Sequence, residues 1–216
     1  MQFLKISVLH IPSMNPLDKI VAQGVKEVLE KDLGKHTYKK IEKEIDDMYG
    51  ISVLDAVSDF SKFDLVLRKF FGNNAVKIES RIFKKVIVVE RKGKEEPSIL
   101  IQDPNTAQII FEAYGDPIKK IILELLLKQP KSIPETISQI KLPQASAYRR
   151  AKELIRDGLL TVAGHTKATD GRKVTEYATT FNRATFDVQE KGLSVSVKLQ
   201  NKFLKDSFVF NSISEK

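Results

Sequence analysis

Residues 103–188 contain a run of short amphipathic segments whose order most restricts the possible fold. Asp103 is followed by Pro104, and Asp116 is followed by Pro117. An aspartate can accept hydrogen bonds from the free backbone N–H groups that begin a helix. Proline fits the first helical position because its missing N–H is not needed there. We therefore predict that a helix begins at each of these prolines.

Two further helices are predicted after this pair. Ser132 and Glu135 have the spacing of a capping box, in which the serine accepts from a backbone N–H and the glutamate reaches back to the helix start. This helix is expected to end near Ile140. A short connection then leads to residues 144–157, which have helical apolar periodicity and stop at Gly158. Two helices joined by a short turn form a helix-turn-helix.

Two strands separated by a polar turn are predicted after the last of these helices. LLTVAG (159–164) and TEYATTF (175–181) are rich in residues that favour strands, and HTKATDGRKV (165–174) between them contains a glycine and several cations. A helix-turn-helix followed by a hairpin with a basic tip is a winged helix. The expected fold class is therefore mainly α with some β structure (α+β), with a helical bundle before the winged helix.

The segments DPIKKIILELL, LPQASAYRRAKELIRDGLL and TDGRKVTEYATT resemble the first helix, the recognition helix and the wing of ArsR-like winged-helix regulators of archaea and bacteria. The resemblance covers residues 103–188 and implies a transcriptional regulator that binds double-stranded DNA. Metal-sensing members of that family use cysteine or clustered histidine ligands. This chain has no cysteine and three histidines, so metal sensing is not carried over.

The residues expected to contact DNA lie on the predicted recognition helix and on the wing. Amide, hydroxyl and guanidinium groups near the start of a recognition helix can read base edges, whereas lysine and arginine elsewhere contact phosphates. The recognition-helix candidates are Gln144, Ser146, Tyr148, Arg149, Arg150 and Lys152. The wing candidates are His165, Lys167, Arg172 and Lys173. The alternative for Arg150 and Arg156 is pairing with Glu153 and Asp157 on the same helix.

The positive charge of the chain is concentrated in the same region. The whole sequence has a formal net charge of +8. Residues 141–173 alone contain eight Lys or Arg and three Asp or Glu, a net charge of +5. A local excess of cations is the electrostatic footprint of a protein that binds a polyanion. We therefore expect double-stranded DNA as the partner and a homodimer as the binding form, because one module reads only a half-site.

The remaining sequence divides into four parts on composition. Residues 1–16 form a proline-punctuated leader, and residues 17–90 show helical apolar spacing closed repeatedly by glycine. Residues 91–102 begin with the charged RKGKEEP and are predicted to be a linker. Residues 189–216 follow the winged helix (103–188) as a β extension and a tail whose last residues we expect to be frayed.

The first half resembles small helical modules of archaeal signalling and regulatory proteins called output domains. LDKIVAQGVKEVL, KKIEKEIDDMYGIS and SKFDLVLRKFFGNNAVKIESRIFKKV carry the resemblance over residues 17–90. It implies a regulatory module that binds a protein partner or a small ligand. Residues 75–89 are strongly apolar and could be one helix or a helix followed by a strand.

The segment after the winged helix alternates between apolar and polar residues. Val195, Val197 and Leu199 share one face, and Gly192 can turn a hairpin before them. The hairpin could extend the sheet of the wing, cover a dimer contact or pack against the first half.

Other functional classes are less well supported by the sequence. The main alternative is a winged helix that docks proteins in a transcription or signalling assembly, and another is single-stranded nucleic-acid binding, which uses aromatic stacking. No phosphate-binding loop or hydrolase motif is present, so we expect no catalytic residues; Asp46 and Asp47 belong to a charged helix face. No metal site, cofactor or membrane span is expected, and the lack of cysteine suits the cytoplasm.

Overall fold

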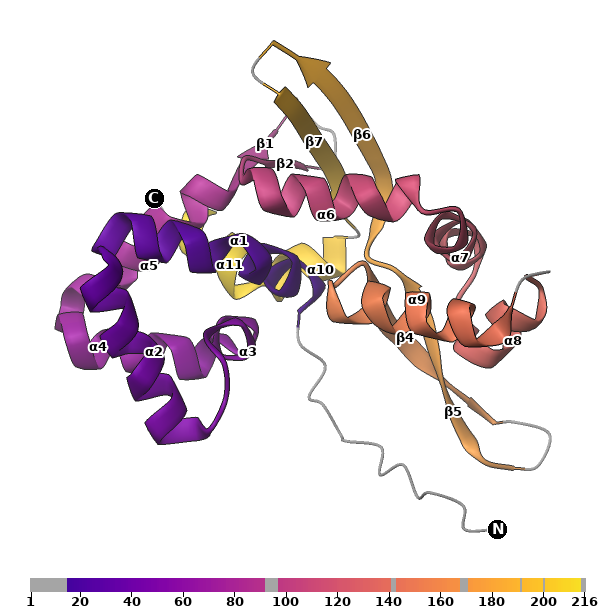
Figure 1. Ribbon diagram of the computed structural model, residues 1–216, viewed down its shortest axis with the longest axis horizontal. Helices are drawn as coiled ribbons and strands as arrows, with labels where there is room; N and C mark the ends of the chain where they lie inside the picture. Colours follow the sequence, from indigo (N-terminus) through magenta and orange to yellow (C-terminus); the bar gives the residue numbers. More distant parts are fainter. Residues whose placement is uncertain are drawn as a thin grey trace.

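A computed structural model describes residues 15–91, 97–140, 143–167, 171–190, 192–199 and 201–214. It shows a mixed α+β fold, as the sequence predicts (Figure 1). The first half is helical: α1 (Pro16–Leu33), α2 (Lys35–Tyr49), α3 (Val53–Ser58), α4 (Phe60–Phe71), a 3₁₀ turn (Gly72–Asn74) and α5 (Ala75–Val86). None of the described helices is both long and apolar enough to cross a membrane.

Helix α1 is the central helix of this half and contacts α2, α3 and α5. The side chain of Asn15 caps its start by accepting from Leu17 N at 2.9 Å. Leu17, Val21, Val25 and Leu29 are completely buried, at the i, i+4 spacing that gives a helix one apolar face. Residues 15 and 16 therefore belong to this cap and helix, whereas the rest of the predicted leader (1–14) lies outside the described residues.

The second half begins with two helices capped as predicted. These are α6 (Pro104–Gly115) and α7 (Pro117–Lys128). Asp103 accepts from Thr106 N at 2.8 Å, and Asp116 accepts from Ile118 N at 2.9 Å. The following elements are β3 (Lys131–Ser132), α8 (Ile133–Ser138), α9 (Gln144–Arg156), β4 (Leu160–Lys167) and β5 (Lys173–Thr179). The three strands form an antiparallel sheet in the order β3-β5-β4.

A second sheet joins the two halves of the chain. Its strands are β1 (Ile87–Glu90), β2 (Ser98–Ile101), β6 (Phe181–Gln189) and β7 (Gly192–Leu199), in the order β1-β2-β7-β6. Within β2, Ile99 is opposite Val197 and Ile101 is opposite Val195. All four of these side chains are buried, and helix α6 packs against β7. The hairpin of β6 and β7 projects from the molecule above α6 (Figure 1).

The prediction of a linker at residues 91–102 is wrong for residues 98–101, because they form strand β2 of this sheet. Strand β2 lies between β1 and β7 in the sheet. Residues 87–90 form a strand directly after α5, so of the two alternatives for residues 75–89 the helix followed by a strand is correct. The charged RKGKEEP is followed directly by SILI, and in this four-residue strand alternate side chains are buried. Residues 92–96 of that segment lie outside the described part.

The end of the chain returns to the first half. Helices α10 (Asn201–Lys205) and α11 (Phe208–Ser214) pack beside α1, and α11 also contacts α5. The Asp18 carboxylate accepts from Ser207 Oγ and from the backbone N–H groups of Phe208 (3.0 Å) and Val209 (3.2 Å). Phe208 stacks on Phe60 with ring centroids 4.1 Å apart. Up to residue 214, the expected frayed tail is therefore a packed helix.

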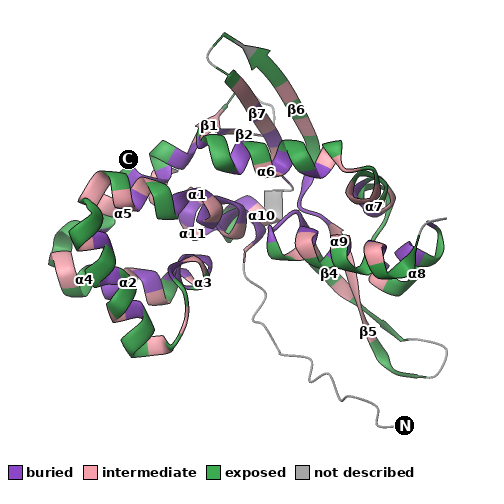
Figure 2. Ribbon diagram, in the orientation of Figure 1, coloured by how far each residue is buried: buried purple, intermediate pink, exposed green. Residues whose placement is uncertain are grey.

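One continuous apolar core results from these connections. It includes buried residues of α1 to α5, of the four-stranded sheet and of α6, α7 and α9; buried residues are purple in Figure 2. The predicted units 17–90 and 103–188 are not separated by a solvated gap in the described residues. Helix α6 packs directly against α1, and Lys19 of α1 donates a hydrogen bond to the Ile155 carbonyl of α9.

Candidate nucleic-acid interface

Helix α9 is held against α7 and α8 by a narrow apolar side. Ala147, Ala151 and Leu154 are buried at the spacing of successive helical turns. Two of the three are alanines, which allow the helix backbones to approach closely. Ser132 Oγ caps the preceding helix α8 by accepting from Glu135 N at 3.3 Å, so the serine half of the predicted capping box is confirmed.

The opposite side of α9 is polar and exposed. Gln144, Tyr148, Arg149 and Lys152 are exposed and Ser146 is half-buried. Tyr148 and Lys152 lie one turn apart, as do Gln144 and Tyr148, so these side chains follow each other along one side of the helix. Gln144, Tyr148 and Lys152 therefore form one exposed row, Arg149 lies beside this row, and Ser146 lies further round the helix.

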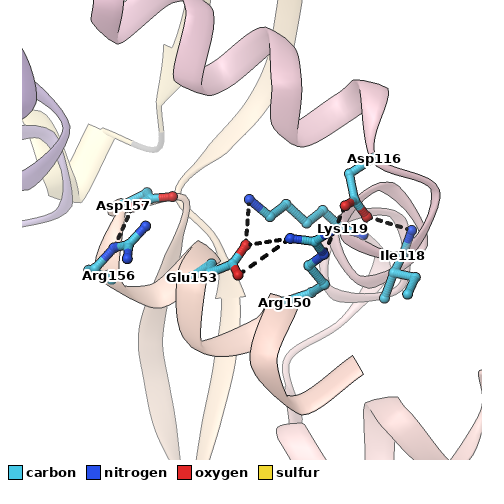
Figure 3. A network of polar contacts seen from close by, with 7 residues as sticks. All are labelled: Asp116, Ile118, Lys119, Arg150, Glu153, Arg156 and Asp157. Atoms are coloured by element: carbon cyan, nitrogen blue, oxygen red, sulfur yellow. Dashed lines mark hydrogen bonds and ion pairs between the residues drawn. The ribbon is translucent and has the colours of Figure 1, made fainter. Parts of the chain in front are cut away.

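Arg150, the sixth residue, points in a different direction. Its Nε lies 2.9 Å from Asp116 Oδ2 at the start of α7, and its Nη1 lies 3.0 Å from Glu153 Oε2 (Figure 3). The contact between Arg150 and Asp116 is an ion pair but not a hydrogen bond, because the Nε–H of Arg150 does not point at an acceptor. Lys119 Nζ also contacts Glu153 Oε2, at 2.9 Å. The structure therefore places Arg150 between α7 and α9, in the pairing that the sequence left open as the alternative.

This network is electrically balanced and partly shielded from solvent. It contains two cations and two carboxylates, and their side chains are between 15% and 29% exposed. Hydrogen bonds from Lys119 and then from Arg150 lower the pKa of Glu153. A partly buried, hydrogen-bonded network holds its members in one geometry more firmly than an exposed pair does. Its consequence is to orient α9 on α7.

The carboxyl end of α9 is anchored to the first half of the chain. Lys19 Nζ on α1 donates a hydrogen bond to the Ile155 carbonyl, which carries the negative end of the helix dipole. Burial lowers the pKa of Lys19, while Asp157 opposes this shift. At Gly158 the backbone has φ +78°, and an added Cβ would lie 3.2 Å from Ile20. Glycine therefore permits both the turn and the close approach of α1.

The β4–β5 hairpin extends beyond α9 on the side away from α6 (Figure 1). Lys167 is directly opposite Lys173 in the register, and both are exposed. His165 is opposite Thr175, whose Oγ1 lies 3.4 Å from His165 Nδ1. Arg172 is exposed beside these lysines and makes an intramolecular interaction. All four predicted wing residues are therefore on the outer part of the hairpin, with residues 168–170 outside the described part.

The histidines do not gather into a metal site in the described residues. His36 lies on α2 and His165 on β4, and nowhere in the described ranges do three His, Asp or Glu side chains form a metal-binding group. His10 lies outside those ranges. Asp46 and Asp47 are exposed on α2, as expected for a charged helix face.

Sequence reasoning missed the two contacts that orient α9. Arg150 and Glu153 have helical i, i+3 spacing, but Asp116 and Lys19 are distant in sequence. The short β3 strand was also missed because two residues give no periodicity.

Comparison of the chain with models of known protein families, with curated proteins and with solved structures found no match.

Proposed function

We propose that the protein is a winged-helix regulator of transcription that binds double-stranded DNA through α9 and the β4–β5 hairpin. The observation that carries the proposal is the division of charge on α9. Arg150 is paired with Asp116 between α9 and α7 and orients the helix, whereas Arg149 and Lys152 are exposed beside Gln144 and Tyr148. This arrangement supports a helix that is held rigidly and presents its other side to a ligand.

The order of the elements supports the winged-helix assignment. Three helices with a two-residue strand between the first and second are followed by a hairpin that completes the sheet β3-β5-β4. In helix-turn-helix proteins the last helix enters the major groove with its amino-terminal residues at the base edges. Gln144, Ser146 and Arg149 would take that role, and Tyr148 and Lys152 would contact the backbone.

The lysines of the hairpin support a backbone contact. Directly opposed like charges destabilise an antiparallel pair, yet Lys167 and Lys173 are opposite each other. A nearby phosphate removes this repulsion and gains from both charges. Lys167 and Lys173 would then bind phosphates beside the groove occupied by α9, with Arg172 and His165 next to them.

We further propose a homodimer in the cytoplasm, with α6 at the contact between protomers. Phe111 on α6 is 47% exposed and packs edge-on against Phe186 of β6. Two copies would read two half-sites related by two-fold symmetry. Size-exclusion chromatography with light scattering measures the mass of the protein alone and in complex with duplex DNA. One protein copy per duplex in the complex would contradict the proposed homodimer.

The experiment for DNA binding is a fluorescence-anisotropy titration against a randomised duplex pool at several salt concentrations. Wild-type protein is compared with Arg149→Ala and Lys173→Ala. Arg149→Ala is expected to lose selectivity between sequences, at a cost of about 1–3 kcal/mol for the preferred site. Lys173→Ala is expected to weaken all sequences alike and to reduce the salt slope by about one.

Absence of duplex binding at moderate salt would contradict the proposal. In that case the exposed apolar side chains of Tyr148 (37%) and Val162 (43%) become candidates for contacts with a protein partner.

A further inference from the structure

A cationic hollow lies at the other end of the molecule, between α5 and α11. Its volume is about 590 Å³. It is lined by Val76, Lys77, Ser80, Arg81, Lys84, Lys85 and Ser212. The first six come from α5 and Ser212 comes from α11, so the hollow forms only because the end of the chain returns to α5.

The four cations share one side of α5 because their positions follow the helical repeat. Lys77, Arg81 and Lys84 are separated by four and three residues, and Lys85 is one turn after Arg81. The apolar side of the same helix contains Ile82, Phe83 and Val86, which are completely buried. Packing of that side against the core therefore turns all four charges toward the hollow.

Only part of this charge is neutralised by the chain. Asp32, at the end of α1, forms ion pairs with both Arg81 and Lys85. The Arg81 Nε lies 2.6 Å from Asp32 Oδ2. Lys77 and Lys84 have no ion-pair partner among the described residues. The contact with Lys85, followed by the charge of Arg81, lowers the pKa of Asp32 and keeps it ionised.

Like charges at this spacing repel one another, which costs stability in the empty protein. An anion between them removes the repulsion and receives charge-assisted hydrogen bonds. Ser80 and Ser212 add hydroxyl donors on two sides of the hollow, and the exposed side chain of Val76 adds an apolar contact. The hollow is open to solvent along α5, so a bound anion would stay partly hydrated.

We propose that the hollow between α5 and α11 binds a small ligand with a phosphate or diphosphate group. The α5 end of the molecule lies far from the β4–β5 hairpin (Figure 1), so the site is separate from the surface proposed to bind DNA. The inference does not depend on DNA binding.

A ligand at this site would also touch the elements that position α9. Ser212 lies on α11, whose first residues are capped by Asp18 of α1. The next residue, Lys19, holds the Ile155 carbonyl at the end of α9. The hollow is thus connected to α9 through two adjacent residues of one helix.

The test is isothermal titration calorimetry of the full-length protein, without DNA, using inorganic pyrophosphate and, in a second arm, ATP. The variant Lys77→Gln/Lys84→Gln removes the two unpaired cations. Lys40→Gln/Lys43→Gln on α2 is the matched control, because both lysines are exposed and the change in net charge is the same. Circular dichroism checks that both variants fold.

Saturable binding to one site is expected, with affinity reduced about tenfold or more in Lys77→Gln/Lys84→Gln and nearly unchanged in the control. Tighter binding of ATP than of pyrophosphate would identify a nucleotide source, and equal binding would identify the phosphate group alone. Three results overturn the proposal. The first is no binding of pyrophosphate or ATP by wild-type protein, and the second is an equal loss of ligand affinity in both double variants. The third is that Lys77→Gln/Lys84→Gln loses as much affinity for duplex DNA as for pyrophosphate. The last result would make the hollow part of a nucleic-acid surface.

Discussion

Replacing Glu79 by glutamine should make the protein more stable, and increasingly so as the pH rises. Glu79 on α5 is completely buried, and its carboxylate oxygens accept no hydrogen bond. Burial, followed by repulsion from Asp64, raises its pKa to about 8. The protonated carboxyl can donate to Asp64, which also pairs with Arg68 at 2.7 Å. The neutral form of Glu79 is therefore the one that suits the fold.

The sign and the size of the effect follow from this pKa. The pKa of Glu79 is higher in the folded protein than its value of 4.5 in the unfolded chain, so the folded state favours the protonated carboxyl. Ionisation of Glu79 therefore destabilises the fold. Stability is lost as the pH rises from about 4.5 to about 8 and then levels off. The rise of the Glu79 pKa from 4.5 to about 8 corresponds to an upper limit of about 5 kcal/mol in unfolding free energy, of which about 3 kcal/mol falls between about pH 6 and about pH 9.

The assay is urea denaturation of wild-type protein and of Glu79→Gln across this pH range. The difference in unfolding free energy between the two should grow with pH and then level off. Glu27→Gln provides the control, because that side chain is 50% exposed on α1. Its pH dependence should be parallel to that of the wild type. If wild-type protein and Glu79→Gln have the same pH dependence, the reasoning about this buried carboxyl is wrong.

Three other substitutions test the contacts between elements. Gly24→Ala should destabilise the protein by about 1–3 kcal/mol, because the new Cβ would lie 2.7 Å from Asp103 Cγ; Gly115→Ala, which has open space, should be neutral in the same denaturation assay. Arg150→Met should lower the melting temperature but leave the salt slope of DNA binding unchanged, since Arg150 pairs inside the protein; a smaller slope would refute this role. Asp18→Ala should cost about 1 kcal/mol and speed amide exchange in α11, whose N–H groups it caps; unchanged exchange would contradict this.

Most helices of this protein could be predicted because their signals are local. Asp103-Pro104 and Asp116-Pro117 cap α6 and α7 where the sequence places them. A cap acts through backbone groups two or three residues away, so its effect does not depend on the rest of the fold. The β6–β7 hairpin was predictable for the same reason, since Gly192 turns the chain and alternate residues of β7 are buried.

The partners of these elements could not be predicted in the same way. The hairpin could have extended the wing sheet, covered a dimer contact or packed on the first half, and the structure pairs β7 with β2. Strand pairing depends on which edges meet in space. Periodicity describes only one segment at a time.

The sequence by itself determined where α6, α7, α8 and α9 begin and which of their sides are apolar, because these properties arise from neighbouring residues. Only the tertiary structure decided that Arg150 faces Asp116 while Arg149 is exposed. It also brought the end of the chain back to Asp18 and next to the cations of α5. Charged side chains are long and flexible, so their direction depends on which distant groups the packed core places within reach.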